Sequence, residues 1–223
     1  MTDTRTLVTG VSSGIGRAIA ERLIADGRRV VGMSRRRGDL PGDHLAVDLT
    51  DTAAVRTATA DLGPLDAIVH AAGLQHSARL GALDDAAFTA MWQVHVAAAA
   101  ALADSAAASV VDGGRILLIG SRTAVGVAGK SQYAATKAAL QAMSRAWAAE
   151  LAPRRVTVNV LAPGPTRTPM LDDPHRAATP PLSPPLGRLV EPSEVADYAA
   201  FLLGPGGAMI TGQHLVICGG ASL

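Results

Sequence analysis

A glycine-rich turn near the start of the chain constrains the fold more than any other feature. It reads Thr9-Gly-Val-Ser-Ser-Gly-Ile-Gly16 and lies between an apolar run at 5–9 and a stretch with helical spacing of apolar residues at 15–24. A second apolar run follows at 29–33. Strand, turn, helix and strand therefore fit into one βαβ unit of about 30 residues, the context in which such a turn binds a dinucleotide.

The glycines of this turn suit a pyrophosphate. A residue without Cβ lets the backbone approach a ligand closely. Free N–H groups and the positive end of the helix dipole then point at the anion. The residues expected to form this region of the site are Gly10, Ser12, Ser13, Gly14, Ile15 and Gly16. A glycine turn with a purely structural role is the alternative.

Short apolar runs alternate with helical segments through the whole chain. The expected strands are 5–9, 29–33, 44–47, 65–70, 115–119, 156–161 and 214–217, with a short helix at about 52–62. The alternation predicts an α/β fold, a Rossmann-like doubly wound parallel sheet with helices on both faces. No linker interrupts the 223 residues, a length that one domain, 1–223, can accommodate.

A second motif, Ser131-Gln-Tyr-Ala-Ala-Thr-Lys137, carries the chemistry. Tyr133 and Lys137 are four residues apart, so on a helix they lie on one face. An ammonium beside a phenol favours the phenolate and lowers a pKa that is otherwise about 10. Such a phenol can exchange a proton with an alcohol or carbonyl oxygen. An ordinary amphipathic helix is the alternative, because this spacing is common.

Taken together, the motifs resemble the short-chain dehydrogenase/reductase family, in particular its 3-oxoacyl reductase-like members, over essentially the whole chain. Beyond the two motifs above, the matching features follow in the family's order: Asp48-Leu49, His70-Ala-Ala-Gly73, Ser121, Pro163-Gly164 with Thr168, Gly212-Gln213 and Gly219-Gly220. The resemblance implies a nicotinamide cofactor, which carries the hydride. It implies that Ser34, Arg35, Arg36, Asp48, Leu49, Ala71, Ala72, Gly73, Tyr133, Lys137, Pro163, Gly164, Thr166 and Thr168 complete the cofactor site.

The resemblance also assigns catalytic roles. Ser121 would donate a hydrogen bond to the substrate oxygen, with Thr123 as a possible substitute. Tyr133 would be the general acid in reduction and the base in oxidation. Lys137 would lower the pKa of the tyrosine and hold the nicotinamide ribose. No metal site is expected.

Three features depart from the family pattern. His95 stands where an asparagine usually supports a water relay from the lysine; a histidine there could maintain the relay or be a packed core residue. Ser121 and Tyr133 are twelve residues apart, one fewer than usual. His70 replaces the first asparagine of its motif, and Cys218 replaces a common aspartate.

The end of the second strand bears on cofactor choice. Members that prefer NAD carry an acid there, whereas this chain has Ser34 followed by three arginines. Arginine can hold a 2′-phosphate through paired charge-assisted hydrogen bonds. Arg35 is the first candidate, Arg36 the second, and Arg17 a possible helper. NADP(H) is therefore expected to be preferred, with NAD(H) possible. The alternative is that the arginines form a solvated loop.

The segment 163–192 breaks the alternation of strands and helices. It contains Pro180-Pro-Leu-Ser-Pro-Pro185, and so much proline excludes long regular helices. In the family the corresponding segment covers the substrate, so a lid is expected, with a plain surface loop as the alternative. The residues that follow two of the motifs, Leu74, Gln75, His76 and Arg122, are expected to line the substrate site.

Composition limits the partners. A net charge of +1 gives no electrostatic case for nucleic acid or an anionic membrane. One cysteine excludes an internal disulfide framework and fits a reducing, cytoplasmic compartment. The first strand begins almost at Met1, which leaves no room for a signal peptide. The alanine-rich stretch 94–108 is expected to be a packed helix, since a membrane span needs about 20 strongly apolar residues.

The resemblance implies a homotetramer, or at least a dimer, in which the helices at about 88–111 and 131–151 pair with their symmetry mates. The leading hypothesis is an NADP(H)-dependent oxidoreductase that interconverts a ketone and a secondary alcohol. One alternative is an NAD-dependent alcohol or diol dehydrogenase. Another, from a different class, is a dinucleotide-binding sensor or scaffold without turnover.

Overall fold

The computed structural model describes residues 5–176, 179 and 183–223. Seven strands form one parallel sheet in the order β3-β2-β1-β4-β5-β6-β7. The strands are β1 (Arg5–Thr9), β2 (Arg29–Ser34), β3 (Asp43–Ala46), β4 (Leu65–His70), β5 (Val110–Ile119), β6 (Thr157–Pro163) and β7 (His214–Ile217). The expected doubly wound parallel sheet is confirmed.

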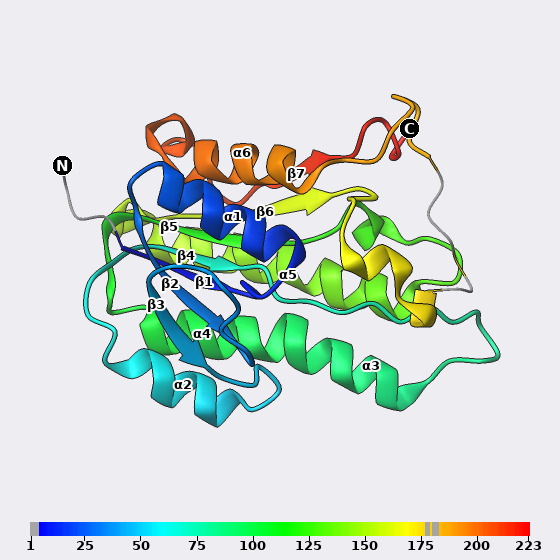
Figure 1. Ribbon diagram of the computed structural model, residues 1–223, viewed down its shortest axis with the longest axis horizontal. Helices are drawn as coiled ribbons and strands as arrows, with labels where there is room; N and C mark the ends of the chain where they lie inside the picture. The colour runs from blue at the N-terminus through cyan, green and yellow to red at the C-terminus, as the bar shows by residue number, and fades with distance from the viewer. Residues whose placement is uncertain (1–4, 177–178, 180–182) are drawn as a thin grey trace.

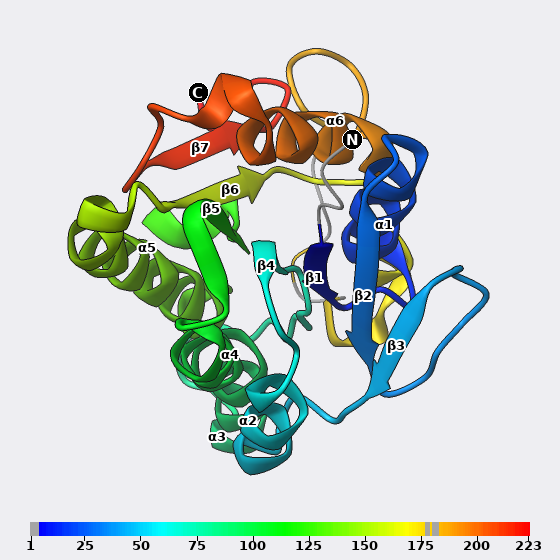
Figure 2. The same ribbon diagram turned by 90° about the vertical axis from the view of Figure 1, so that its left-hand side faces the viewer.

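Helices cover both faces of this sheet (Figure 1). Figure 2 shows α1 and α6 on one side and α2, α4 and α5 on the other. Their bounds are α1 (Gly14–Ala25), α2 (Thr52–Ala60), α3 (Asp85–Trp92), α4 (Ala98–Ala106), α5 (Ser131–Leu151) and α6 (Pro192–Leu203). A π-helical turn, Gln93–Ala97, joins α3 to α4, so that one continuous helical rod carries both.

The inner strands β4 and β6 are mostly apolar because both faces of the sheet are buried there. Successive side chains of a strand point to opposite faces. In β1, Leu7 packs with the core under α2, α4 and α5, whereas Val8 packs with the core under α1 and α6. In β4, Ile68 packs with the first of these cores and Val69 with the second.

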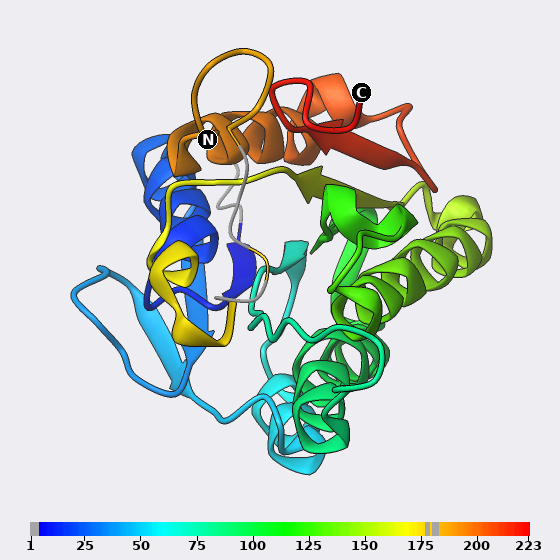
Figure 3. The ribbon, with the colours of Figure 1, turned by 90° about the vertical axis from the view of Figure 1, so that its right-hand side faces the viewer.

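The sheet order reverses between β1 and β4, and this point positions the site. From β1 the chain winds outward to β2 and β3, and from β4 it winds the other way to β7. In such sheets a crevice opens at the carboxyl ends of the two strands beside the reversal. Figure 3 looks onto this edge, where the segment that follows β6 crosses in front of the sheet.

Two expected boundaries are wrong. The helix expected at 88–111 ends at Ala106, and the strand expected at 115–119 already begins at Val110. Val110 and Val111 are β-branched residues that favour extended backbone, and Val110 pairs with Leu65 of β4. The pairing register between β4 and β5 then shifts between Leu65 and Ala67. The two glycines at 113–114 therefore lie within β5 and do not end it.

The stretch Asp85–Ala106 is long and apolar enough to cross a membrane by length and composition alone. Half of its most apolar window is buried inside the molecule. In α4 the buried residues include Ala98, Ala99, Ala101 and Leu102, all in the core between α4 and the sheet. The expectation of a packed helix is therefore confirmed.

Candidate active site

The glycine turn and the end of β4 meet at the reversal point. Gly10 has φ 74°, and a Cβ on it would lie 2.8 Å from the Cα of Ala72. Only glycine therefore lets the β1–α1 turn approach β4 this closely. The contact joins two stretches of backbone that are far apart in the sequence and forms the floor of the crevice.

A cavity of about 820 Å³ extends along this edge of the sheet. Every residue that the sequence assigned to cofactor binding lines it, as do Ser121 and Arg122. Leu74 and Gln75 line it too, but His76 does not. The residues that the sequence named thus line one continuous cavity, although they lie in seven separate segments of the chain.

The first turn of α1 can hold an anion. Ser13 occupies the N-cap position, but its side chain accepts no hydrogen bond from the helix, and the first turn carries no acid. The first N–H groups of a helix have no partner within it, and they bear the positive end of the dipole. Gly14, Ile15 and Gly16 line the cavity at this point, so the geometry fits a pyrophosphate.

The end of β2 offers two exposed arginines. Arg35 and Arg36 line the cavity, and neither forms an ion pair with another described residue. Arg17, the possible helper, is already bound to Glu21 at 2.8 Å and to Asp39 at 2.6 Å. The guanidinium groups of Arg35 and Arg36 thus remain available for a phosphate.

Ser34 shapes the loop that carries these arginines. Its hydroxyl donates to the carbonyl of Arg36 at 2.7 Å. Its oxygen lies 3.0 Å from Nε2 of His44, which therefore donates to it. On the next strand end, Asp48 accepts hydrogen bonds from the backbone N–H and the hydroxyl of Thr50, and these lower the pKa of the Asp48 carboxyl.

Tyr133 and Lys137 lie in the first two turns of α5, and both line the cavity. Burial raises the pKa of Tyr133, although the Ser121 hydroxyl and the charge of Arg176 act in the opposite direction. Burial also lowers the pKa of Lys137 to about 7. The lowered pKa of Tyr133 expected from its lysine is therefore wrong for this structure, because desolvation outweighs the opposing effects of Ser121 and Arg176.

The Lys137 ammonium reaches the backbone of β5. Nζ donates to the carbonyl oxygen of Ile119 at 2.9 Å and lies 5.9 Å from the centre of the Tyr133 ring. Ser121 follows the same strand, and its hydroxyl lies 2.9 Å from that of Thr123. Either hydroxyl can therefore donate to a substrate oxygen, and Thr123 stays a possible substitute for Ser121.

His95 lies in the π-helical turn and is fully buried. Its Nε2 accepts from the N–H of Leu74 at 3.1 Å, so Nδ1 carries the proton and donates to Thr136 Oγ1 at 2.8 Å. The Thr136 hydroxyl donates in turn to the carbonyl of Tyr133 at 2.8 Å. Burial, with the charge of Lys137, lowers the pKa of His95, so the ring is neutral.

These contacts favour the packed interpretation of His95, because both ring nitrogens are bound to other groups and the ring does not line the cavity. The ring holds the backbone beside Lys137: a Cβ on Gly73 would lie 3.0 Å from its Nε2 and 3.6 Å from the lysine Nζ. His95 is thus a positioning residue in this structure.

His70, at the end of β4, has a similar positioning role. The Thr9 hydroxyl accepts the N–H groups of Ala71 and Ala72, so it donates to Nδ1 of His70 at 3.0 Å. Nε2 of His70 then donates to the carbonyl of Val94 at 3.0 Å. Burial lowers the His70 pKa to about 4, and the neutral ring ties β1, β4 and the π-helical turn together.

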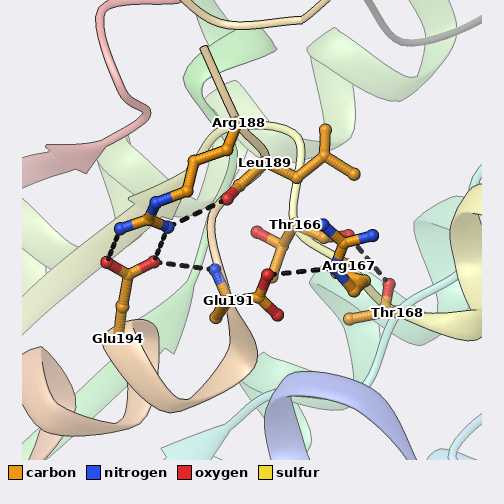
Figure 4. Close-up of polar contacts among 7 residues, drawn as sticks. All are labelled: Thr166, Arg167, Thr168, Arg188, Leu189, Glu191 and Glu194. Atoms are coloured by element: carbon orange, nitrogen blue, oxygen red, sulfur yellow. Dashed lines mark hydrogen bonds and ion pairs between the residues drawn. The ribbon is translucent and has the colours of Figure 1, made fainter. Parts of the chain in front are cut away.

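Among its described residues, the segment 163–192 forms two short helical turns, Pro169–Asp172 and Pro174–Arg176. Figure 4 shows how it is attached to the start of α6: Arg188 holds both oxygens of Glu194 at 2.7 Å, and Arg167 holds Glu191 at 2.9 Å. Residues 177–178 and 180–182, including the start of the proline run at 180–185, lie outside the described residues.

Two further contacts join this segment to the loop after β4. The N–H of Ser77 donates to the carbonyl of His175 at 2.9 Å. The rings of His76 and His175 lie 4.2 Å apart. The segment therefore bridges from the start of α6 to the opposite rim of the cavity.

Sequence reasoning missed several cavity residues, most importantly Lys130 and Arg176, along with Arg79 and Met170. Lys130 lies three residues before Tyr133, a spacing that places it one helical turn away. This closeness to Tyr133 was the one feature of the sequence that could have identified Lys130 as a cavity residue. Nothing in the sequence marks Arg176, because it comes from an irregular segment whose path is set by the fold.

Comparison with known proteins defines the class. A family model described as enoyl-(acyl carrier protein) reductase matches residues 10–222. The chain is 36% identical over 234 residues to the 3-oxoacyl-[acyl-carrier-protein] reductase FabG of Vibrio harveyi, covering 96% of this chain and 95% of that protein. The chain is thus an oxidoreductase of the short-chain dehydrogenase/reductase family.

Solved structures support the same family. A blue fluorescent protein from a metagenomic library in complex with NADPH has a TM-score of 0.87 and 32% identity, covering 99% of this chain and 98% of that chain. A short chain dehydrogenase from Burkholderia cenocepacia J2315 in complex with NADP has a TM-score of 0.87 and 34% identity, with the same coverage.

Proposed function

We propose that the protein is an NADP(H)-dependent oxidoreductase that interconverts a ketone and a secondary alcohol, with Tyr133 as general acid and base. One observation carries this proposal: Tyr133, Lys137 and Ser121 line the same cavity as the glycine turn. A proton donor thus lies within the space that a nicotinamide dinucleotide would share with its substrate. The name of the Vibrio harveyi relative, a 3-oxoacyl reductase, supports a carbonyl substrate.

A bound nicotinamide cofactor supplies or accepts the hydride. The residues of this chain do the rest. Ser121 or Thr123 donates a hydrogen bond that orients the carbonyl oxygen, and Tyr133 gives that oxygen its proton. Burial raises the pKa of Tyr133 and so favours the protonated phenol, the form that donates a proton in the direction of reduction. Lys137, held by Ile119, is positioned to bind the ribose hydroxyls.

The charges around Ser34 support NADP(H) over NAD(H). The 2′-phosphate of the cofactor would meet Arg35 and Arg36 at a strand end that carries no carboxylate. Both structural relatives described above are complexes with NADPH or NADP. An NAD-dependent alcohol dehydrogenase is the second candidate, since Arg35 and Arg36 are exposed.

Two expectations remain proposals. The segment 163–192 would act as a lid, since it lines the cavity and reaches its far rim. The chain would form a homotetramer, or at least a dimer, through α3–α4 and α5; light scattering at micromolar concentration checks this, and a monomer would contradict it. The single cysteine fits a cytoplasmic location.

The test is a panel of ketones and secondary alcohols assayed with NADPH and NADH, alongside calorimetry of each cofactor alone. We expect turnover of at least one ketone with NADPH. Cofactor binding without turnover across the panel would favour the sensor or scaffold instead. Turnover with NADH alone would favour the NAD-dependent dehydrogenase.

A further inference from the structure

Besides Lys137 and Arg79, the substrate side of the cavity gathers three cations. Arg122 follows Ser121, Lys130 begins the turn that leads into Tyr133, and Arg176 comes from the segment 163–192. All three line the cavity, and together they are the basic cluster. The cluster surrounds the end of the cavity where the substrate carbonyl would meet the phenol.

Two members of the cluster are buried as thoroughly as core residues. Arg176 and Lys130 are each 7% exposed. Burial lowers the pKa of both, and the charges of Arg176 and Arg122 lower that of Lys130 further. Placing like charges together away from water is costly unless an opposite charge accompanies them.

No carboxylate among the described residues neutralises the cluster. Arg176 donates from Nη1 to the carbonyl of Met170 at 3.1 Å, while its buried Nε–H has no acceptor. Asp173 raises the Arg176 pKa without forming an ion pair. The Nε of Arg122 is also buried without a partner. Among the described lining residues, Asp48 is the only acid, and it follows β3, at the cofactor end.

We propose that the basic cluster binds an anionic oxygen group of the substrate, a carboxylate or a phosphate, and so selects ketones that carry one. This inference rests on the proposed function and names its substrate class. The guanidinium fork of Arg176 matches two oxygens of such a group. The anion would then anchor the substrate while its carbonyl meets Tyr133, whose phenol already experiences the charge of Arg176.

The cofactor's pyrophosphate is the competing occupant. It has its own place at the first turn of α1, which lies beyond β4 from the cluster in the sheet order. Arg122 and Lys130 belong to the β5–α5 side of the reversal point. Arg122 and Lys130 therefore do not contribute to that phosphate site, and the NADPH affinity of an Arg176 variant shows which of the two occupants Arg176 serves.

The experiment compares ketones that differ only in charge: acetoacetate and levulinate against their methyl esters, with NADPH. We expect wild-type kcat/KM to favour the acids at least about 10-fold. Arg176→Gln should reduce this preference by about 10-fold, to near equality, mainly through KM, and leave the esters nearly unchanged. Arg176→Lys should restore some of it. Lys130→Gln is a second variant that acts on the same group.

Dihydroxyacetone phosphate against dihydroxyacetone separates the two anion sources: a preference for this phosphate alone assigns the cluster to phosphate. Arg22→Gln, an exposed arginine of α1 outside the cavity, is the matched control and should change none of these ratios. Equal kcat/KM for acids, phosphate and neutral partners in the wild type would overturn the inference. So would an Arg176→Gln variant that loses NADPH affinity but keeps its preference for anions.

Calorimetry keeps this test separate from the proposed function. Levulinate should bind the enzyme–NADP⁺ complex more tightly than its methyl ester, and Arg176→Gln should remove the difference. Such binding without turnover of any ketone would leave the anion site standing and remove the catalytic proposal. Turnover of neutral ketones without any preference for anions would do the reverse.

Discussion

The two ends of the cavity are built from different materials. The cofactor end is built mainly from backbone and small residues at the ends of β1 and β4, with helix N–H groups that need no side chain to hold an anion, and Arg35 and Arg36 are added at the end of β2. The substrate end consists of long side chains from three separate segments, among them Lys130 and Arg176. Recognition by backbone requires glycines at fixed places, whereas recognition by side chains requires only that the fold bring them together.

The difference shows what each end can tolerate. At the cofactor end, Gly10 has no room for a methyl group, so the sequence there is closely constrained. At the substrate end, a cation can come from any segment that reaches the cavity. Specificity can therefore change at the substrate end while the cofactor end and the proton donor remain as they are.

The largest expected effect is on turnover, and it tests the Tyr133 phenol, which lies between the two ends of the cavity. Tyr133→Phe removes the proton donor but keeps the ring that packs edge-on against His95. We expect turnover to fall by about 10²-fold or more with NADPH affinity nearly unchanged, as measured by steady-state kinetics and calorimetry.

The chain's other tyrosine supplies the control. Tyr198 lies in α6 outside the cavity, so Tyr198→Phe should keep its turnover. Retained activity in Tyr133→Phe would remove the tyrosine from the mechanism.

Because the cofactor end is built mainly from backbone, every residue that the sequence assigned to the cofactor lines the cavity. The glycine turn and the residues after β4 act locally, through φ angles and helix ends that short motifs encode. The parallel, doubly wound sheet followed from the alternation of strands and helices, and α5 begins and ends where the sequence placed it. Short motifs therefore predicted the backbone at these places, whereas the end of α4 and the start of β5 were predicted wrongly.

The remaining features depend on tertiary packing. Burial, not the neighbouring lysine, dominates the pKa of Tyr133, and burial cannot be read from a four-residue spacing. The hydrogen bonds of His95 depend on Leu74 and Thr136, from two other segments. Arg176 reaches the cavity only because the segment after β6 crosses it.

The next effect in size tests the cofactor end. Ser34→Asp combined with Arg35→Ala should weaken NADPH and spare or improve NADH. One change removes a donor to the 2′-phosphate, and the other adds a carboxylate that repels phosphate and accepts from ribose hydroxyls. Charge-assisted bonds contribute roughly 1.5–3 kcal/mol, so the ratio of kcat/KM for the two cofactors should shift by about 10- to 100-fold.

Arg37 provides the matched control in the same loop. It donates to the carbonyl of Gly42 and does not line the cavity, so Arg37→Ala should leave the cofactor ratio as it is. If the wild type already prefers NADH, or if the double variant keeps the wild-type ratio, the arginines form only a solvated loop. Preference for anionic ketones should be unaffected in either variant, because that preference belongs to the other end.

The smallest expected effect concerns how the substrate end is attached to the fold. Glu194 accepts two hydrogen bonds from Arg188 and one from the N–H of Glu191, and the Arg188 contact is the main reason that its pKa falls to about 2. A carboxyl whose folded pKa is lowered stabilises the protein fully above its unfolded pKa, here 4.5, and loses that contribution as the pH falls towards 2. Glu194→Gln should therefore lower the melting temperature at pH 7 by at most about 4 °C, because the pair is exposed. The difference in melting temperature from wild type should shrink steadily below pH 4.5, and NADPH affinity should not change.

The control is Glu150→Gln. Glu150 is an exposed residue of α5 with no ion pair among the described residues, so this variant should show no such trend. If the loss of melting temperature in Glu194→Gln stays constant down to pH 3, the Arg188–Glu194 contact does not act through its charge. If the loss comes with weaker NADPH binding, the contact does not belong to the substrate end alone.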